Sequence, residues 1–271
     1  MDIFLLIGII TGLLTLIVGM ILKGANVAVL LNPAAIVIIF VGTTAAVINS
    51  FPKSELSKIG KVAGVLFKDK KNMNAADIVI QLVDMSQIAR REGLLALENM
   101  TEKMDNPFMK KGLEMAVDGL EQEYIREVLN IEIENMEERH RLGASIFTTA
   151  GGAAPTLGVM GAVVGLIAAL GNLDDVEALG HMIAGAFVAT LFGIFVGYVM
   201  CHPFATRLKR KSFAEIRVMY IIVEGILSIQ AGENPKSIVI KLEGMLSPEE
   251  RAELSRKQNS GKNSEGESKD G

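Results

Sequence analysis

The chain has 271 residues, of which 50% are hydrophobic and 21% are charged, and its mean hydropathy is +0.37. This composition excludes an intrinsically disordered chain and disfavours an ordinary soluble globule. The formal net charge of −4 and the pI of about 5.6 disfavour a nucleic-acid-binding protein. The single cysteine, Cys201, excludes a disulfide framework and a thiolate metal site within one chain.

Four segments are apolar over about the 20 residues that a helix needs to cross a bilayer, and the shorter second segment can be extended at both ends. They cover residues 3–22, 34–48, 146–170 and 179–201. A cleaved signal peptide is the alternative for the first segment, but this segment lacks a basic start and its apolar run is too long. The sequence therefore predicts an all-α integral membrane protein with four transmembrane helices and a large helical cytoplasmic region.

The distribution of Lys and Arg predicts the orientation of these spans. Apart from Lys23, which follows the first span, every basic residue lies between spans two and three or after span four. The short connection between spans three and four, GNLDDVEA, has none. The positive-inside rule therefore predicts that both termini and the long middle segment are cytoplasmic.

The middle segment is charged and helical in pattern, without the alternation that is typical of strands. Asn74 is suited to cap a helix, and Asn106-Pro107 interrupts the apolar spacing between two helices. A third charged helix, over residues 122–141, is expected to continue into the third span. After the fourth span, we expect a helix over residues 203–230 and then a turn at AGENP.

These patterns divide the chain into five parts. The parts are transmembrane helices 1 and 2 (1–50), a cytoplasmic helical region (51–145), transmembrane helices 3 and 4 (146–202), cytoplasmic C-terminal helices (203–254) and a tail (255–271). The tail is rich in Ser, Gly, Lys and Glu, and we expect it to be disordered.

No soluble-enzyme motif is present, so we do not expect an enzyme. The stretch GGAAPTLG lacks the Lys-Ser or Lys-Thr of a phosphate-binding loop, and the three histidines are too scattered to predict a metal site. The four spans contain no Asp, Glu, Lys or Arg. Because an ion path through a membrane usually needs a titratable group at depth, the chain either moves no ions or uses a carboxylate from a partner.

Small residues form a stripe on each of the last two spans, at the three- and four-residue spacing that keeps them on one helix face. They are Gly151, Ala154, Gly158, Gly161, Gly165 and Ala168 on span three, and Ala186, Ala189, Gly193 and Gly197 on span four. Such faces let helices approach closely in lipid. Two interpretations stand equally: a tight bundle around another helix, or packing of spans three and four against each other.

Prolines and threonines interrupt these two spans. Pro155 lies near the start of span three and Pro203 at the end of span four, and a proline kinks or ends a helix by freeing a backbone carbonyl. Thr156 and Thr190 add hydroxyl groups. These hydroxyls either line an ion path or bond to carbonyls of their own helices, and the residues alone favour the second interpretation.

The chain resembles the MotA family of bacterial flagellar stator subunits, which belongs to the MotA/TolQ/ExbB proton channel superfamily. The resemblance covers nearly the whole chain, and three stretches carry it: ARREGLLALE (89–98), GGAAPTLGVMGAVVGLIAALGNL (151–173) and GHMIAGAFVATLFGIFVGYVMCHPFATRL (180–208). It implies a bacterial inner-membrane protein, five copies of which surround two MotB-like subunits. Each MotB-like subunit would bring the missing membrane Asp. Ion flow through the complex would then drive torque on the rotor protein FliG.

The resemblance implies that Arg90 and Glu98 are the charged pair that faces the rotor. On one continuous helix, two residues eight positions apart lie about 80° apart around the axis and about 12 Å apart along it. Without the resemblance, both would be read as ordinary solvated charges.

The resemblance also implies residues of the ion path. Pro155 and Pro203 match two family prolines that couple ion passage to movement, and Thr156 and Thr190 match hydroxyls near the partner's Asp. Ala162 falls where sodium-driven relatives usually carry Thr, and Na⁺ needs oxygen ligands as other hard cations do. We therefore expect protons as the transported ion, with sodium as the alternative, and no cofactor or bound metal.

Two other functions fit parts of the sequence. An ExbB- or TolQ-like energy transducer shares the pattern of spans three and four, but such proteins usually have three spans. A non-conducting membrane scaffold would also lack carboxylates in its spans. A membrane enzyme is the least favoured, because no nucleophile–base pair or metal-ligand cluster is visible.

Overall fold

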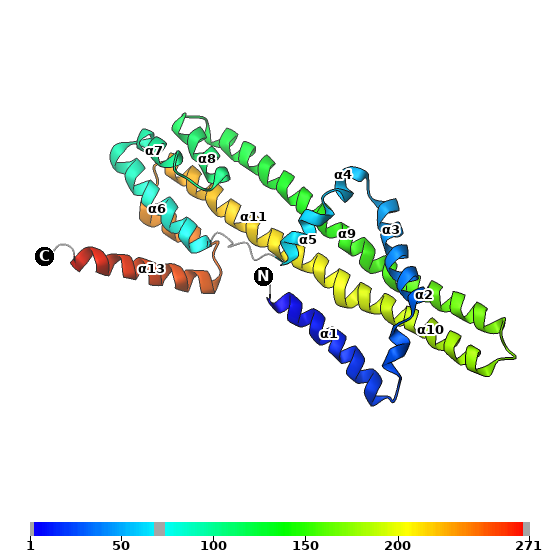
Figure 1. Ribbon diagram of the computed structural model, residues 1–271. Coiled ribbons are helices and arrows are strands. Elements are labelled where there is room, and N and C mark those ends of the chain that lie inside the picture. Colours follow the sequence, from blue (N-terminus) through cyan, green and yellow to red (C-terminus); the bar gives the residue numbers. More distant parts are fainter. Residues whose placement is uncertain (1–2, 68–73, 268–271) are drawn as a thin grey trace. The chain divides into compact units, whose positions relative to one another are not determined.

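The computed structural model describes the backbone of residues 3–67 and 74–267, and their side chains as far as residue 259. All regular elements of these residues are helices, which confirms the all-α prediction (Figure 1). The chain divides into two compact units. Unit 1 consists of Met1–Lys70 and Arg139–Lys211, and unit 2 of Lys71–Glu138 and Ser212–Gly271.

Unit 1 contains the apolar spans. In chain order its helices are α1 (Ile3–Leu22), η1 (Val27–Leu30), α2 (Pro33–Ile36), η2 (Val37–Val41), α3 (Gly42–Ser50), α4 (Lys53–Leu56), α5 (Ile59–Phe67), the second half of α9 (Gln122–Leu170), α10 (Val176–Ile194), η4 (Phe195–Cys201) and the start of α11 (His202–Gln230). Elements η2 and η4 are π-helical turns inside otherwise continuous helices. Within the described residues, four helical runs are long and apolar enough to cross a membrane, as predicted.

Polar side chains start two of the spans because their oxygens accept hydrogen bonds from backbone N–H groups that have no partner within the helix. The Asn32 amide oxygen accepts from the N–H of Ala35 at 3.1 Å. The Asp175 carboxylate accepts from the N–H groups of Glu177 and Ala178 at 3.1 and 3.0 Å. α10 therefore begins directly after a tight turn and lies beside the second half of α9 (Figure 1).

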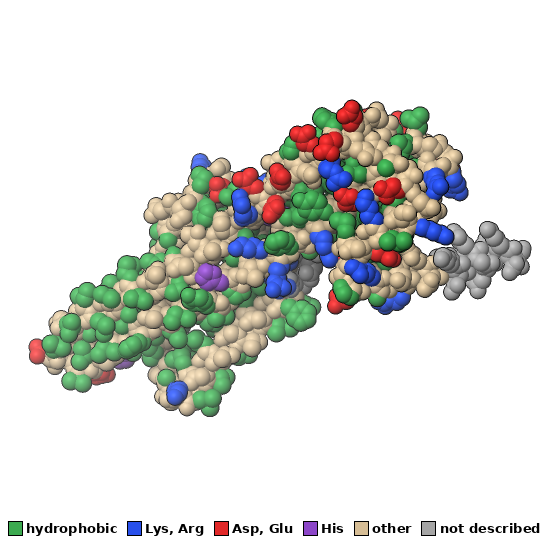
Figure 2. Space-filling view, turned by 180° about the vertical axis from the view of Figure 1, so that it is seen from behind, with side chains coloured by type: hydrophobic (Ala, Val, Ile, Leu, Met, Phe, Trp, Pro, Cys, Tyr) green, Lys and Arg blue, Asp and Glu red, His purple; other side chains and the backbone are tan. Residues whose placement is uncertain are grey.

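Apolar side chains cover the surface of the spans (Figure 2). α1 buries only Leu5, whereas Phe4 and Leu22 are 80% and 82% exposed. Continuous apolar surface of this extent is not found on soluble monomers, and it suits contact with lipid or with other membrane helices.

Unit 1 extends beyond the predicted boundary between the first two transmembrane helices (1–50) and the cytoplasmic helical region (51–145). α4 and α5 belong to unit 1, because Leu66 of α5 is 1% exposed and packs with Leu5, Phe204 and Leu208. Residues 139–145 and 203–211 belong to the same unit. The apolar face of α5 is the physical reason for the difference, since it is buried against the ends of the spans.

Unit 2 is a helical bundle. It contains α6 (Ala75–Glu92), η3 (Leu94–Leu97), α7 (Glu98–Thr101), α8 (Pro107–Val117), the first part of α9, the last part of α11, α12 (Pro235–Glu243) and α13 (Pro248–Glu267). Asn74 caps α6, as predicted. The predicted interruption at Asn106-Pro107 separates α7 from α8, and Asn106 also caps α8 with Pro107 in its first turn. The predictions that α9 continues into the third span and that α11 ends at Gln230 are also confirmed.

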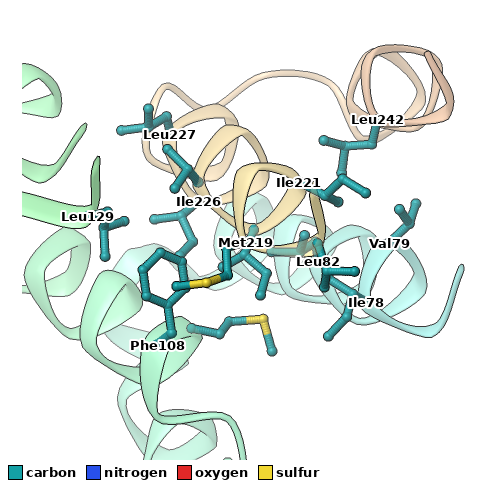
Figure 3. Close-up of a cluster of buried hydrophobic side chains, with 14 of the residues drawn as sticks. Ile78, Val79, Leu82, Phe108, Leu129, Met219, Ile221, Ile226, Leu227 and Leu242 are labelled. Atoms are coloured by element: carbon teal, nitrogen blue, oxygen red, sulfur yellow. The ribbon is translucent and has the colours of Figure 1, made fainter. Parts of the chain in front are cut away.

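One apolar core holds unit 2 together. Leu82 of α6, Phe108 of α8, Leu129 of α9 and Ile226 of α11 point into it (Figure 3). The contact between α6 and α11 is close, because a Cβ at Gly225 would lie 2.5 Å from a methyl carbon of Leu82. Glycine at this position therefore lets the two helix backbones approach.

Ion pairs fix the charged face of the same unit. The Glu224 carboxylate pairs with Arg126 at 2.6 Å and with Lys241 at 3.2 Å. Burial raises the pKa of the Glu224 carboxyl, but the hydrogen bonds and positive charges of Arg126 and Lys241 outweigh burial, so the pKa lies below its ordinary value. Glu224 is therefore ionised at neutral pH and links α9, α11 and α12.

The C-terminal segment differs from the disordered tail expected over residues 255–271. α13 continues to Glu267, and the last four residues lie outside the described part of the chain. Glu249 and Glu250 in the first turn favour helix formation through the helix dipole, and the Lys257–Glu253 pair, four residues apart, adds to it.

Candidate functional site

Glycines bring α9 and α10 into backbone contact. A Cβ at Gly193 would lie 2.6 Å from the carbonyl oxygen of Ala154 and 3.0 Å from the Cα of Gly158. A Cβ at Gly165 would lie 2.8 Å from the Cβ of Ala186. Of the two interpretations of the small-residue stripes, the structure shows packing of spans three and four against each other.

The proline of span three lies opposite a π-helical turn of span four. Pro155 lies inside α9, which continues past it to Leu170, so the carbonyl of Gly151 lacks its usual intrahelical donor. Gly197 of η4 packs against this carbonyl and against the proline ring. A Cβ at Gly197 would lie 2.7 Å from the Gly151 oxygen and 2.8 Å from the Cγ of Pro155. Both helices thus depart from regular hydrogen bonding at the same level, as functional helices often do.

The two threonines make different hydrogen bonds. The Thr156 hydroxyl donates to the carbonyl of Ala153 in its own helix at 2.8 Å, as the residues alone suggest. The Thr190 hydroxyl donates across to the carbonyl of Gly158 in α9 at 3.3 Å. Thr190 therefore joins the two spans, and this bond could not be read from the sequence.

Ala162 lies close to that bond. In an α-helix the N–H of residue 162 pairs with the carbonyl of residue 158, which is also the acceptor for Thr190. Ala162 is half-buried and lies two turns beyond Pro155 on the same helix face. Pro203 is the second residue of α11 and is exposed, so the structure does not bring it into this group.

A second face of α9 is uncovered in the described chain. Gly152, Thr156, Val159 and Val163 recur at spacings of four, three and four residues, so they share one face. Val159 and Val163 are 57% and 51% exposed, and a Cβ at Gly152 would meet nothing within 4 Å. The hydroxyl-bearing residue Thr156 therefore lies on a face that is available to lipid or to another helix.

The expectation that Arg90 and Glu98 share one helix is wrong. α6 ends at Glu92, and Gly93 has φ of 88°, a value that side-chain-bearing residues rarely adopt. Glu98 then begins the separate short helix α7. Both side chains are exposed on unit 2, but the spacing of eight residues does not give their separation.

The sequence reasoning missed a polar group between the spans. The Asn32 amide lies against Gly185, where a Cβ would be 2.5 Å from its nitrogen. Asn32 and His181 line a groove of about 340 Å³ together with small residues of α9 and α10. The pair Asn32-Pro33 was the available signal, because Asn before Pro is a common helix start.

Comparison with known proteins identifies the family. Residues 100–220 match the MotA/TolQ/ExbB proton channel family. The chain is 52% identical over 242 residues to Motility protein A of Bacillus subtilis (strain 168), covering 89% of this chain and 90% of that protein. The chain belongs to the MotA/TolQ/ExbB proton channel family.

Two solved structures have the same fold. A chain in the structure of the flagellar MotAB stator complex from Bacillus subtilis matches with a TM-score of 0.87 at 50% identity, covering 92% of this chain and 98% of that one. A chain in the structure of C. jejuni MotAB matches with a TM-score of 0.87 at 34% identity, covering 92% and 97%. The similarity includes both units, because it spans nearly the whole length.

The contact at Gly193 gives a test of how the spans are joined. In the Gly193→Ala variant, the new methyl group meets backbone atoms of α9, which cannot move aside as a side chain can. We expect the unfolding midpoint of the purified chain in detergent to fall by roughly 2–10 °C.

Gly180→Ala is the matched control, because Gly180 lies on the same helix and a Cβ there meets nothing within 4 Å. Its midpoint should stay the same or rise slightly, since Ala favours helix. Equal midpoints for the two variants would show that α9 and α10 are not in backbone contact.

Proposed function

We propose that the chain is the MotA-type subunit of a flagellar stator, which works with a MotB-type partner. Together they couple proton flow across the bacterial inner membrane to torque on the rotor protein FliG. The observation that carries this proposal is the similarity of fold and sequence, over most of the chain, to a chain of a flagellar MotAB stator complex. Four spans also favour this function over that of an ExbB- or TolQ-like transducer, which usually has three.

The partner supplies the ion-binding group. The four spans of this chain contain no Asp, Glu, Lys or Arg, and a proton cannot be held at depth by apolar side chains. A carboxylate on the partner fills this role. Its neutral form is tolerated in an apolar groove far better than its charged form, so each protonation changes which surroundings it prefers.

The uncovered face of α9 receives the partner's helix. Its small and hydroxyl-bearing residues, Gly152 and Thr156, allow close approach and offer a polar group beside an incoming carboxyl group. Five copies of the chain around two partner subunits would present this face repeatedly, as the family resemblance implies. The partner's Asp would then meet Thr156 of each copy in turn.

The contact between spans three and four transmits the effect of protonating the partner's carboxylate. Backbone contact at Gly158 and Gly193, with the Thr190 hydrogen bond, makes α9 and α10 move as one body. The irregular level at Pro155 and Gly197 is where that body can bend. One charge crossing 100 mV supplies about 2.3 kcal/mol, which is enough to bias such a bend.

Unit 2 faces the rotor in the cytoplasm. The positive-inside distribution of Lys and Arg supports this orientation, with both termini on the same side. Arg90 and Glu98 present exposed charges of opposite sign on this unit, which suits electrostatic docking on a charged rotor surface. Ala162 offers no side-chain oxygen for Na⁺, which supports protons as the transported ion. The proposal assigns the chain no enzymatic activity.

Swimming tests the proposed function. The chain and a MotB-type partner are expressed in a strain that lacks its own stator, in sodium-free medium. We expect swimming to be restored and a protonophore to stop it. Absence of swimming, with both chains present in the membrane, would contradict the stator function, and swimming only with sodium would contradict the choice of ion.

The assigned residues separate into two groups in the same strain. Thr190→Val and Pro155→Ala should leave fluorescently labelled stators at the motor and reduce torque, because they affect coupling. Arg90→Glu and Glu98→Lys should reduce recruitment to the motor as well, because they affect docking.

The rotation of tethered cells measures torque, and fluorescence at the motor measures recruitment of the stator. Ile10→Val, a conservative change at an exposed apolar position of α1 outside both groups, serves as the control and should change neither reading. Full torque in the Thr190 and Pro155 variants would contradict their role in coupling. Normal recruitment and torque in both charge variants would contradict the assigned rotor face.

A further inference from the structure

Seven exposed basic side chains gather around α5 at one end of unit 1. We call them the α5 basic cluster: Lys53, Lys58, Lys61, Arg139, Arg141, Lys209 and Arg210. They come from α4, α5, α9, α11 and the link between α4 and α5. In residues 51–67, 139–145 and 203–211, which form this end, Glu55 is the only acidic residue.

Contacts of α5 place it against the parts of α9 and α11 that carry four of these basic residues. Leu66 packs with Leu5, Phe204 and Leu208, and Val62 lies against α9, where a Cβ at Gly143 would be 3.0 Å from a Val62 methyl group. The Lys211 ammonium donates to two carbonyls in the last turn of α5, those of Val65 and Leu66, at 2.9 and 3.2 Å. α5 therefore lies across α9 and α11 where these helices leave the apolar spans.

The side chains of the cluster have no carboxylate partner, in contrast to several basic residues of unit 2. In the described residues, Lys111, Arg126, Arg217, Lys241 and Lys257 of unit 2 all pair with carboxylates. None of the seven cluster side chains pairs with a carboxylate of the described chain. Like charges gathered without partners repel one another, so the arrangement favours binding of an external anion.

The surroundings of the cluster identify the anion. Val65 and Phe67 of α5 are 41% and 36% exposed beside the basic side chains, so α5 offers an apolar edge as well as positive charge. Short amphipathic helices with basic residues lie at the boundary between headgroups and acyl chains. Juxtamembrane clusters of four to eight Lys and Arg residues are typical of anionic-lipid binding.

We propose that the α5 basic cluster binds the phosphate groups of anionic phospholipids in the cytoplasmic leaflet. The proposal rests on the orientation given above. Lipid contacts of α4 and α5 would fix the depth of the spans in the bilayer and supply the counter-charge that the protein lacks. A soluble phosphate compound would use the charges but not the apolar edge, so the lipid is the better fit.

Lipid binding to the purified complex tests the proposal. The full chain, purified with its MotB-type partner in detergent, is titrated with dioleoyl phosphatidylglycerol or dioleoyl phosphatidylcholine, and bound lipid is counted by native mass spectrometry. We expect phosphatidylglycerol to bind at least about fivefold more tightly. Lys58→Gln combined with Lys61→Gln should remove most of this preference.

The control removes the same charge elsewhere. Lys23→Gln with Lys103→Gln replaces two exposed lysines outside the cluster and should keep the preference. Arg139→Gln with Lys209→Gln is the second cluster variant, used if the α5 variant does not fold. A preference that persists in a folded cluster variant would overturn the proposal. Loss of the preference in excess inorganic phosphate would overturn the choice of lipid as the source of the phosphate.

This assay stands apart from the swimming test. Lipid preference is measured on the purified complex without a motor, so a chain that binds lipid but does not restore swimming would contradict only the stator function. A chain that restores swimming without any lipid preference would contradict only the α5 basic cluster.

Discussion

Backbone contact between α9 and α10 is the constraint on which the rest of unit 1 depends. In lipid there is no hydrophobic drive to bring apolar helices together, so close packing and polar bonds must hold them. Gly158 and Gly193 allow this approach, and the Thr190 hydrogen bond reinforces it. Once these helices form one body, the irregular level at Pro155 and Gly197 becomes the place where the body can change shape, and the opposite face of α9 is left for a partner.

The charged residues are distributed according to their surroundings. The spans hold no Lys, Arg, Asp or Glu. Several ion pairs join the helices of unit 2, and the seven basic side chains of the α5 basic cluster have no carboxylate partner in the described chain. Each location follows from the energy of a charge in its surroundings, since an unpaired charge is unfavourable in lipid and tolerated at the membrane surface. An ion path through such a protein therefore needs a group that the chain does not contain, which is why the partner is central to the proposed mechanism.

Much of the fold followed from local physical rules in the sequence. The four spans, the caps at Asn74 and Asn106 and the continuation of α9 into the third span depend on residues close in the chain. The partner of Thr190, the π-helical turns and the placement of α5 depend on contacts between distant segments, which no local pattern encodes. Gly93 shows the difference for the site: the helical spacing of Arg90 and Glu98 looked continuous, but one residue with positive φ ended α6 between them.

The central claim is that this chain moves no ion without the partner's carboxylate. Its most direct test is the rotation of tethered cells while the membrane potential is varied. The cells express this chain with either the intact partner or a partner whose membrane Asp is replaced by Asn. We predict that rotation speed follows the potential with the intact partner and that rotation stops with the Asn variant, although both complexes co-purify. Continued rotation with the Asn variant would contradict the account, because the chain would then need an ion-binding group of its own.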